Sequence, residues 1–177
     1  MNLLKEKKRI EVALDSYRQK LDTIPDDAFD VTPPAGGWSY AEVYSHIMQA
    51  TLLAHIALDR CTNGNPKPVK DKANWLGKLV LFFGRFPPGM RIKAPQKVSD
   101  KMPAQKITKE DARNLIIKCR KRLEDALPQV KNDTVKNRSK HPRLGMLNSP
   151  QWLRFIRIHL QHHLLQLQRI DSSFSKQ

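Results

Sequence analysis

Helix-breaking residues divide this chain of 177 residues into four long amphipathic stretches, and this division limits the possible folds more than any other feature. Apolar residues recur every three to four positions over about residues 2–21, 40–61, 109–127 and 150–171. This is the period of a helix with one buried face. The segments between them, such as TIPDDAFDVTPPAGGW and TNGNPKP, are rich in prolines and glycines that cannot continue a helix. No strand alternation is present, so the sequence predicts an all-α fold.

Capping residues indicate where the helices begin. Ser39 precedes the second helix, and Glu42 three residues later completes a capping box. Thr108 is placed to cap the third helix. For the fourth helix we expect Ser149 as the cap and Pro150 at the first helical position, which the fixed φ of proline suits.

Four such helices predict a four-helix bundle that forms a single domain over residues 1–177. A long crossover, residues 62–107, connects the second helix to the third. Within it the apolar run WLGKLVLFF, residues 75–83, predicts a short helix that lies on the bundle. The alternative is a patch for a membrane surface or a protein partner. The run is too short to span a bilayer, which needs about 20 residues.

The formal net charge of +15 favours an acidic partner: nucleic acid, an anionic membrane surface or an anionic small molecule. The lysines and arginines, however, are spread from Lys5 to Lys176 and form no single stripe. No zinc finger, glycine-rich phosphate loop or aromatic-interleaved basic motif accompanies them. We therefore interpret the charge as a basic, solvated surface, and nucleic acid is the less favoured partner.

The two cysteines, Cys61 and Cys119, form neither a CxxC motif nor a disulfide framework. Both fall on apolar helix faces, which predicts buried free thiols in a reducing cytoplasm. The first residues, MNLLKEKKRIEVALDS, carry charges where a secretory apolar core would lie, so we expect no signal peptide. These features predict a cytoplasmic protein without a transmembrane segment.

Three of the six histidines lie within FIRIHLQHHLLQLQRI, residues 155–170. At 100° per residue, one arc of roughly 80° should face the bundle axis. It contains Trp152, Ile156, His159, His163, Leu167 and Ile170. The opposite side contains Arg154, Arg157, Gln161 and Gln168. His162 lies at the margin of the arc. On the second helix the same projection places His46 in the apolar arc and His55 on the polar side.

Three inward imidazoles on two helices favour a metal site. Imidazole is a good ligand for zinc, nickel and iron, and His159 and His163 are one turn apart on one helix. With His46 as the third ligand, one coordination position stays open, as in catalytic sites. The alternative is that these histidines are ordinary core residues whose ring nitrogens find other partners.

Two blocks of the sequence carry a resemblance to a known family. GGWSYAEVYSHI, residues 36–47, and HPRLGMLNSPQWLRFIRIHLQHHLLQL, residues 141–167, follow one another in the order typical of that family. The chain resembles the DinB-like superfamily, which includes the YfiT-type metal-dependent hydrolases. The resemblance implies a bundle of up-down-down-up topology and a divalent metal, nickel, zinc or iron, on His46, His159 and His163. It also implies a homodimer, because dimers are common in the family.

Four further residues are candidates for the same site. Gln166 lies near His159 on the helical projection and could hydrogen-bond a ligand imidazole. His162 could line the edge of the site, and His141 could enter it from the turn before the fourth helix. Glu42 shares a helix face with His46 and could act as a base, although its capping role already explains it.

The predicted function is that of a metal-dependent enzyme acting on a small-molecule substrate. The family that the chain resembles includes S-transferases and isomerases that use a low-molecular-weight thiol such as bacillithiol or mycothiol. The resemblance therefore implies a metal that activates a thiol in an S-transferase or water in a hydrolase. The basic surface suits an anionic substrate. Two alternatives stay open: a non-catalytic metal-binding scaffold related to stress, and a basic nucleic-acid-binding protein.

Overall fold

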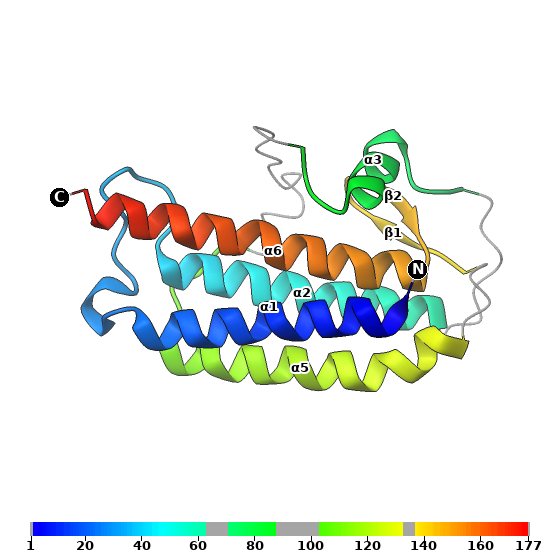
Figure 1. Cartoon of the computed structure of the whole chain (residues 1–177), viewed down its shortest axis with the longest axis horizontal. Coiled ribbons are helices and arrows are strands. Elements are labelled where there is room, and N and C mark those ends of the chain that lie inside the picture. The colour runs from blue at the N-terminus through cyan, green and yellow to red at the C-terminus, as the bar shows by residue number, and fades with distance from the viewer. Residues whose placement is uncertain (1, 63–70, 88–102, 133–136, 177) are drawn as a thin grey trace.

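The computed structural model describes residues 2–62, 71–87, 103–132 and 137–176 (Figure 1). In chain order its elements are α1 (Leu3–Thr23), the short 3₁₀ helix η1 (Asp26–Ala28), α2 (Tyr40–Thr62), α3 (Trp75–Phe83), α5 (Lys109–Asn132), β1 (Ser139–His141), β2 (Gly145–Leu147) and α6 (Ser149–Phe174). Within the described parts of the chain, no helix is both long and apolar enough to cross a membrane.

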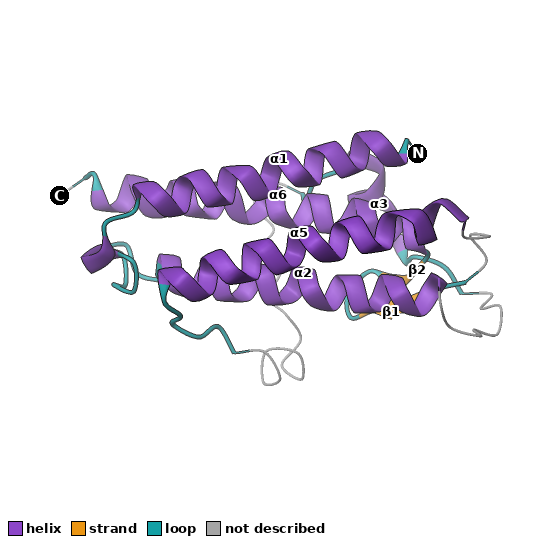
Figure 2. Cartoon of the chain, turned by 90° about the horizontal axis from the view of Figure 1, so that it is seen from below, coloured by secondary structure: helices purple, strands orange, loops and turns teal. Residues whose placement is uncertain are grey.

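The four long helices form the predicted bundle with up-down-down-up topology. In Figure 1, α1 and α6 run in one direction, and α2 and α5 run in the other. Both α1 and α2 pack against α5 and α6, so α1 lies diagonally opposite α2 (Figure 2). Every long helix therefore has two packed neighbours, which widens the buried arc that each helix needs.

The helix starts agree with the predicted caps, with one correction. The capping box of α2 is present, because the carboxylate of Glu42 accepts hydrogen bonds from the backbone N–H and the hydroxyl of Ser39, both at 2.9 Å. The cap of α6 is Asn148 and not Ser149. Asn148 and Gln151 form a reciprocal box at 3.0 Å each way, which leaves Ser149 inside the first turn.

The third long helix ends later than predicted. We expected it to end near residue 127, before Pro128, but α5 continues to Asn132 with this proline inside it. Proline removes one backbone hydrogen bond from a helix. The next turn places Val130 in the core, and burial of this side chain offsets the loss.

Two buried tyrosines join three helices in the centre of the core. The hydroxyl of Tyr44 on α2 donates to the carbonyl of Tyr17 on α1 at 2.7 Å. The hydroxyl of Tyr17 in turn donates to the carbonyl of Leu160 on α6 at 2.8 Å. Burial raises the pKa of both phenols, so both remain hydrogen-bond donors. These bonds fix the position of the turn of α6 next to His159.

A small hairpin, which the sequence pattern did not predict, connects α5 to α6. Strands β1 and β2 pair antiparallel, with His141 opposite Gly145. Three-residue strands are too short for alternation to be visible in the sequence. The hairpin also holds the start of α3, since the backbone N–H of Asn74 donates to the carbonyl of Leu144 at 2.9 Å. Gly77 permits this contact, because a Cβ there would lie 2.3 Å from the same carbonyl oxygen. The short helix predicted over residues 75–83 is confirmed, and it packs against α6.

The prediction that Arg157 lies on the exposed side of α6 is wrong, because this residue is 5% exposed. Its Nε donates to a carboxylate oxygen of Glu6 on α1 at 2.6 Å, and both side chains are buried. Its Nη1 donates to Gln161 at 2.6 Å and to the carbonyl of Gly84 at 3.3 Å. The helical projection failed here because α1 covers a second side of α6.

His55 is the second correction, since it is 1% exposed and does not lie on a polar face of α2. The reason is again a second neighbour, because α2 packs against α5 as well as α6. Among the described residues neither ring nitrogen of His55 has a hydrogen-bond partner. Burial, with a smaller contribution from Arg122, lowers the pKa of His55 to about 4. This imidazole is therefore neutral in the folded protein near pH 7.

His55→Leu is expected to raise the free energy of unfolding at pH 7 by about 1–2 kcal/mol, because it removes a buried polar ring without partners. It should also make the protein less sensitive to acid. The unfolded chain takes up a proton on His55 below about pH 6.5, whereas the folded chain does so only near pH 4. Stability is therefore lost as the pH falls through this window, by on the order of 3 kcal/mol.

Urea denaturation of both proteins between pH 4 and pH 8, with a chelator present, measures this difference. The stability difference between the variant and the wild type should grow as the pH falls. Parallel pH profiles for the two proteins would show that His55 does not titrate differently on folding.

Candidate metal centre

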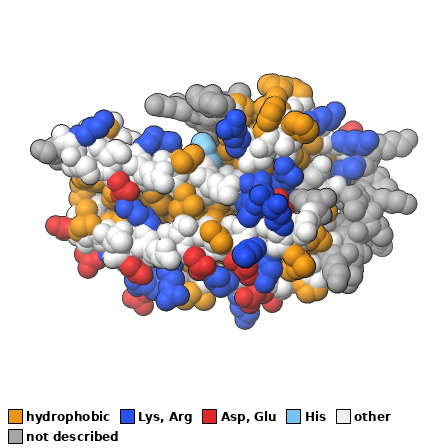
Figure 3. Space-filling view, viewed as in Figure 1, with side chains coloured by type: hydrophobic (Ala, Val, Ile, Leu, Met, Phe, Trp, Pro, Cys, Tyr) orange, Lys and Arg blue, Asp and Glu red, His pale blue; other side chains and the backbone are white. Residues whose placement is uncertain are grey.

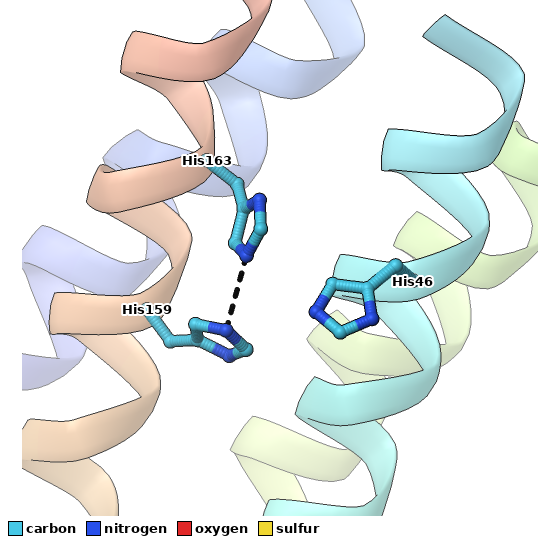
Figure 4. A group of neighbouring side chains, drawn as sticks. All are labelled: His46, His159 and His163. Atoms are coloured by element: carbon cyan, nitrogen blue, oxygen red, sulfur yellow. Dashed lines mark hydrogen bonds between the residues drawn. The ribbon is translucent and has the colours of Figure 1, made fainter. Parts of the chain in front are cut away.

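Three imidazoles from two helices meet between α2 and α6 (Figure 4). Nε2 of His163 lies 3.1 Å from Nε2 of His159, and one ring nitrogen from each of His46, His159 and His163 lies within 4.8 Å of the others. Two ligands of a tetrahedral ion with metal–nitrogen distances of about 2.0–2.1 Å are roughly 3.3 Å apart. The pair on α6 therefore already has the spacing of two ligands of one ion.

The i, i+4 relation of His159 and His163 explains this spacing, because such side chains lie on one helix face. His46 faces them from α2, as Figure 4 shows. Its ring centroid is 5.7 Å from that of His159 and 5.0 Å from that of His163. The structure therefore brings together the three histidines that the helical projection placed inside the bundle.

Gln166 orients one of these rings. Its side-chain oxygen lies 2.7 Å from Nδ1 of His163. Because an amide oxygen can only accept, Nδ1 of His163 carries the proton, and the lone pair of Nε2 faces the cluster, where it accepts from Nε2 of His159. A ligand histidine typically donates its second N–H to such a partner, which fixes the tautomer and the ring orientation. Gln166 thus lies where the sequence predicted a supporting residue.

The three imidazoles are neutral near pH 7, which is the form that binds metal. Burial lowers the pKa of His46 and lowers the pKa of His163 to about 3. Burial, followed by the neighbouring histidines, lowers the pKa of His159 well below its usual value. A protonated ring would be desolvated and close to its neighbours, so the folded state favours three neutral rings, each with one nitrogen that carries a lone pair.

Aromatic side chains surround the cluster, and none of them was among the residues predicted for the site. The ring centroid of Trp38, a residue before α2, lies 4.9 Å from that of His46. Phe155 stacks on His159 at 5.2 Å with the ring planes 24° apart. Phe86, from the long connection, lies 6.2 Å from His159. Nothing in a helical pattern could place a connection residue at the site. Phe155, however, is one turn before His159 and could have been found in the projection.

The remaining candidates lie at different distances from the cluster. His162 is half-buried beside it, with its ring 5.1 Å from His163. His141 stays in the hairpin turn, where its Nδ1 accepts from the N–H groups of Arg143 and Leu144, both at 3.1 Å. It reaches the site only through Phe155, which lies 4.4 Å from its ring.

The carboxylate of Glu42 makes the capping bonds of α2 and is not part of the cluster. Within the described ranges the group of side chains able to hold an ion consists of imidazoles alone. Three neutral nitrogen ligands suit zinc, nickel or iron(II), and they leave coordination positions for a further ligand.

Fold and site together define a class: a helical bundle of up-down-down-up topology with a histidine cluster between α2 and α6. The model of the DinB superfamily matches residues 9–167. The chain therefore belongs to the DinB superfamily. A comparison with curated proteins gives no match.

Solved structures with the same fold are only distantly similar in sequence. YfiT from Bacillus subtilis, described as "a probable metal-dependent hydrolase with an unusual four-helix bundle topology", is 13% identical with a TM-score of 0.66, over 98% of this chain and 87% of that one. TT2238, a four-helix bundle protein, is 18% identical with a TM-score of 0.61, over 95% of this chain and 99% of that one. The mycothiol-dependent maleylpyruvate isomerase is 11% identical with a TM-score of 0.65, over 93% of this chain and 60% of that one. At these identities the likeness concerns the fold.

Proposed function

We propose that the protein is a metal-dependent enzyme in which His46, His159 and His163 hold a divalent ion, nickel, zinc or iron(II). The observation that carries this proposal is the 3.1 Å separation of the two Nε2 atoms on α6, with His46 facing them from α2. Two structures with this fold, described as "a probable metal-dependent hydrolase" and a mycothiol-dependent isomerase, support a catalytic function.

A divalent ion at this position supplies a Lewis acid that lowers the pKa of water or of a thiol, for hydrolysis or S-transfer. The protein itself does the rest. Gln166 holds the His163 ring with Nε2 toward the cluster. Phe155 packs on His159 and Trp38 packs on His46, which restricts the orientation of both rings. A low-molecular-weight thiol, an anionic substrate, a homodimer and a cytoplasmic location remain predictions from the sequence.

The test begins with protein purified without a histidine tag and loaded with nickel, zinc or iron(II). Metal content is measured, and hydrolysis of ester and amide panels is compared with transfer of bacillithiol, mycothiol and cysteine to electrophiles. We expect turnover in one of these two reaction classes, hydrolysis or thiol transfer. His46→Ala should abolish this turnover, while circular dichroism shows that the helix content is unchanged.

Each alternative gives a different result. A metal-binding scaffold binds nickel, zinc or iron(II) but converts none of the substrates with any of these ions. A nucleic-acid-binding protein binds DNA with an affinity that falls steeply with salt and does not depend on the histidines. Either outcome would contradict the enzyme proposal.

A further inference from the structure

A second feature adjoins the histidine cluster on the side of α3. The chain leaves α3 through Gly84 and forms a pocket of about 170 Å³ against the last turns of this helix. The pocket is lined by Leu79, Phe83, Arg85, Phe86 and Pro87. Four of these five residues are apolar, and the fifth is a cation. An enclosed apolar cavity of about 150 Å³ can hold a benzene molecule, so this pocket, which is open to solvent, is comparable in size to one phenyl ring.

Phe86 connects the pocket to the cluster. Phe86 lines the pocket, and the centroid of its ring lies 5.0 Å from that of His162 and 6.2 Å from that of His159. Phe86 therefore belongs both to the lining of the pocket and to the aromatic surroundings of the cluster. A molecule with a polar group at the imidazoles and an apolar arm of a few carbon atoms can reach both along Phe86.

The pocket wall is held in place by α6. Arg154 donates from Nη2 to the carbonyl of Phe82 at 3.2 Å, and Arg157 donates from Nη1 to the carbonyl of Gly84 at 3.3 Å. These carbonyls are the free acceptors at the end of α3, which a helix cannot satisfy internally. Gly84 takes φ of +66°, a left-handed conformation that ends the helix. The wall is thus fixed to the helix that carries two of the cluster histidines.

The described parts of the chain cover the apolar residues of the pocket only in part. Phe83 is 60% exposed, and Figure 3 shows hydrophobic surface gathered over α3. Covering such a ring with an apolar group is favourable by about 25 cal/mol for each Å² removed from water. The basic Arg85 at the same pocket favours a ligand that also carries a negative charge.

We propose that this pocket is the substrate-binding subsite of the enzyme and takes a phenyl-sized or short alkyl arm with a negative charge near its end. This proposal rests on the function proposed above, because the reacting group would lie at His46, His159 and His163. The substrate class is then an aromatic or short aliphatic acid derivative, an ester, amide or electrophile. Leu79 and Phe83 contact the arm, and Arg85 contacts the anion.

The test uses hydroxamates as probes, because they bind metal ions through one end and vary freely at the other. The protein is loaded with cobalt(II), and affinities are read from the change in its visible absorption spectrum. We expect benzohydroxamate to bind about 30-fold more tightly than acetohydroxamate, from burial of the ring. Phe83→Ala should reduce this ratio about fivefold, whereas Phe82→Ala should leave it unchanged. Phe82 is the matched control, since it is the neighbouring, 79% exposed ring that does not line the pocket.

The anion is tested with 4-carboxybenzohydroxamate. We expect it to bind more tightly than benzohydroxamate in the wild type, and Arg85→Gln should remove this preference. The subsite proposal is wrong if cobalt(II) binds but the ratio of the affinities for benzohydroxamate and acetohydroxamate is the same in the wild type, Phe83→Ala and Phe82→Ala. Absence of cobalt(II) binding overturns the metal centre instead. In that case, nuclear magnetic resonance of the metal-free protein decides the subsite. Benzohydroxamate must shift the Leu79 methyl signals in the wild type and not in Phe83→Ala.

Discussion

Addition of nickel or zinc is expected to raise the unfolding temperature of the wild-type protein and to leave that of the His159→Ala/His163→Ala double variant unchanged. An ion that binds only the folded state stabilises it by about 4 kcal/mol at a free concentration 1,000 times its Kd. For a chain of this length, this corresponds to a rise of roughly 8–16 °C. The effect is large because the two histidines supply both ligands of α6.

Differential scanning calorimetry across a range of buffered free metal concentrations makes the measurement. Gln166→Leu should shift the curve to about 10–100-fold higher metal concentrations, since it removes the hydrogen bond that holds His163. His55→Leu is the matched control, because it removes an imidazole of α2 that is not in the cluster. Equal stabilisation of the double variant and the wild type would place the bound ion elsewhere.

Glu6→Ala is expected to lower the free energy of unfolding by about 3–5 kcal/mol, the second largest effect. The change leaves the buried guanidinium of Arg157 without its carboxylate, and an uncompensated buried charge is costly. Gln161 and the carbonyl of Gly84 remain as partners of Arg157, but neither carries a charge. Urea denaturation monitored by circular dichroism measures the loss.

Two further variants separate this explanation from simple loss of packing. Glu6→Leu combined with Arg157→Met replaces the buried pair by apolar side chains, and its stability should return to that of the wild type or exceed it. Asp22→Ala removes the exposed partner of Arg113, a pair 3.0 Å apart, and should change stability by less than about 1 kcal/mol. The explanation fails if the double variant is as unstable as Glu6→Ala.

The sequence was sufficient for the helices and for the centre of the site. Helical period and capping residues are local properties, so the four long helices and the cap at Ser39 could be predicted. The cluster could also be predicted, because an i, i+4 pair such as His159 and His163 has its spacing fixed by the helix alone. The third histidine needed only the assumption that α2 faces α6.

The rest depends on which elements pack together, and no local pattern contains that information. His55 and Arg157 were assigned to exposed faces because one apolar stripe was expected for each helix, whereas each helix has two neighbours. The buried partner of Arg157 is Glu6, at the other end of the chain. Phe86 reaches the site from a connection whose course has no helical period.

The diagonal position of α1 relative to α2 has a consequence for how the chain folds. The strongest helix contacts are those of α2 with α6 and with α5, and of α1 with α6, and most of these pairs are far apart in the sequence. Helical bundles that assemble from neighbouring hairpins fold fastest, because their contacts are local. Here α1 and α2 cannot form a native pair by themselves, because each of them packs against α5 and α6, so the core forms through contacts between helices far apart in the sequence. Because α6 packs against both α1 and α2 and carries His159 and His163, the contacts that complete the core also bring these two histidines to His46.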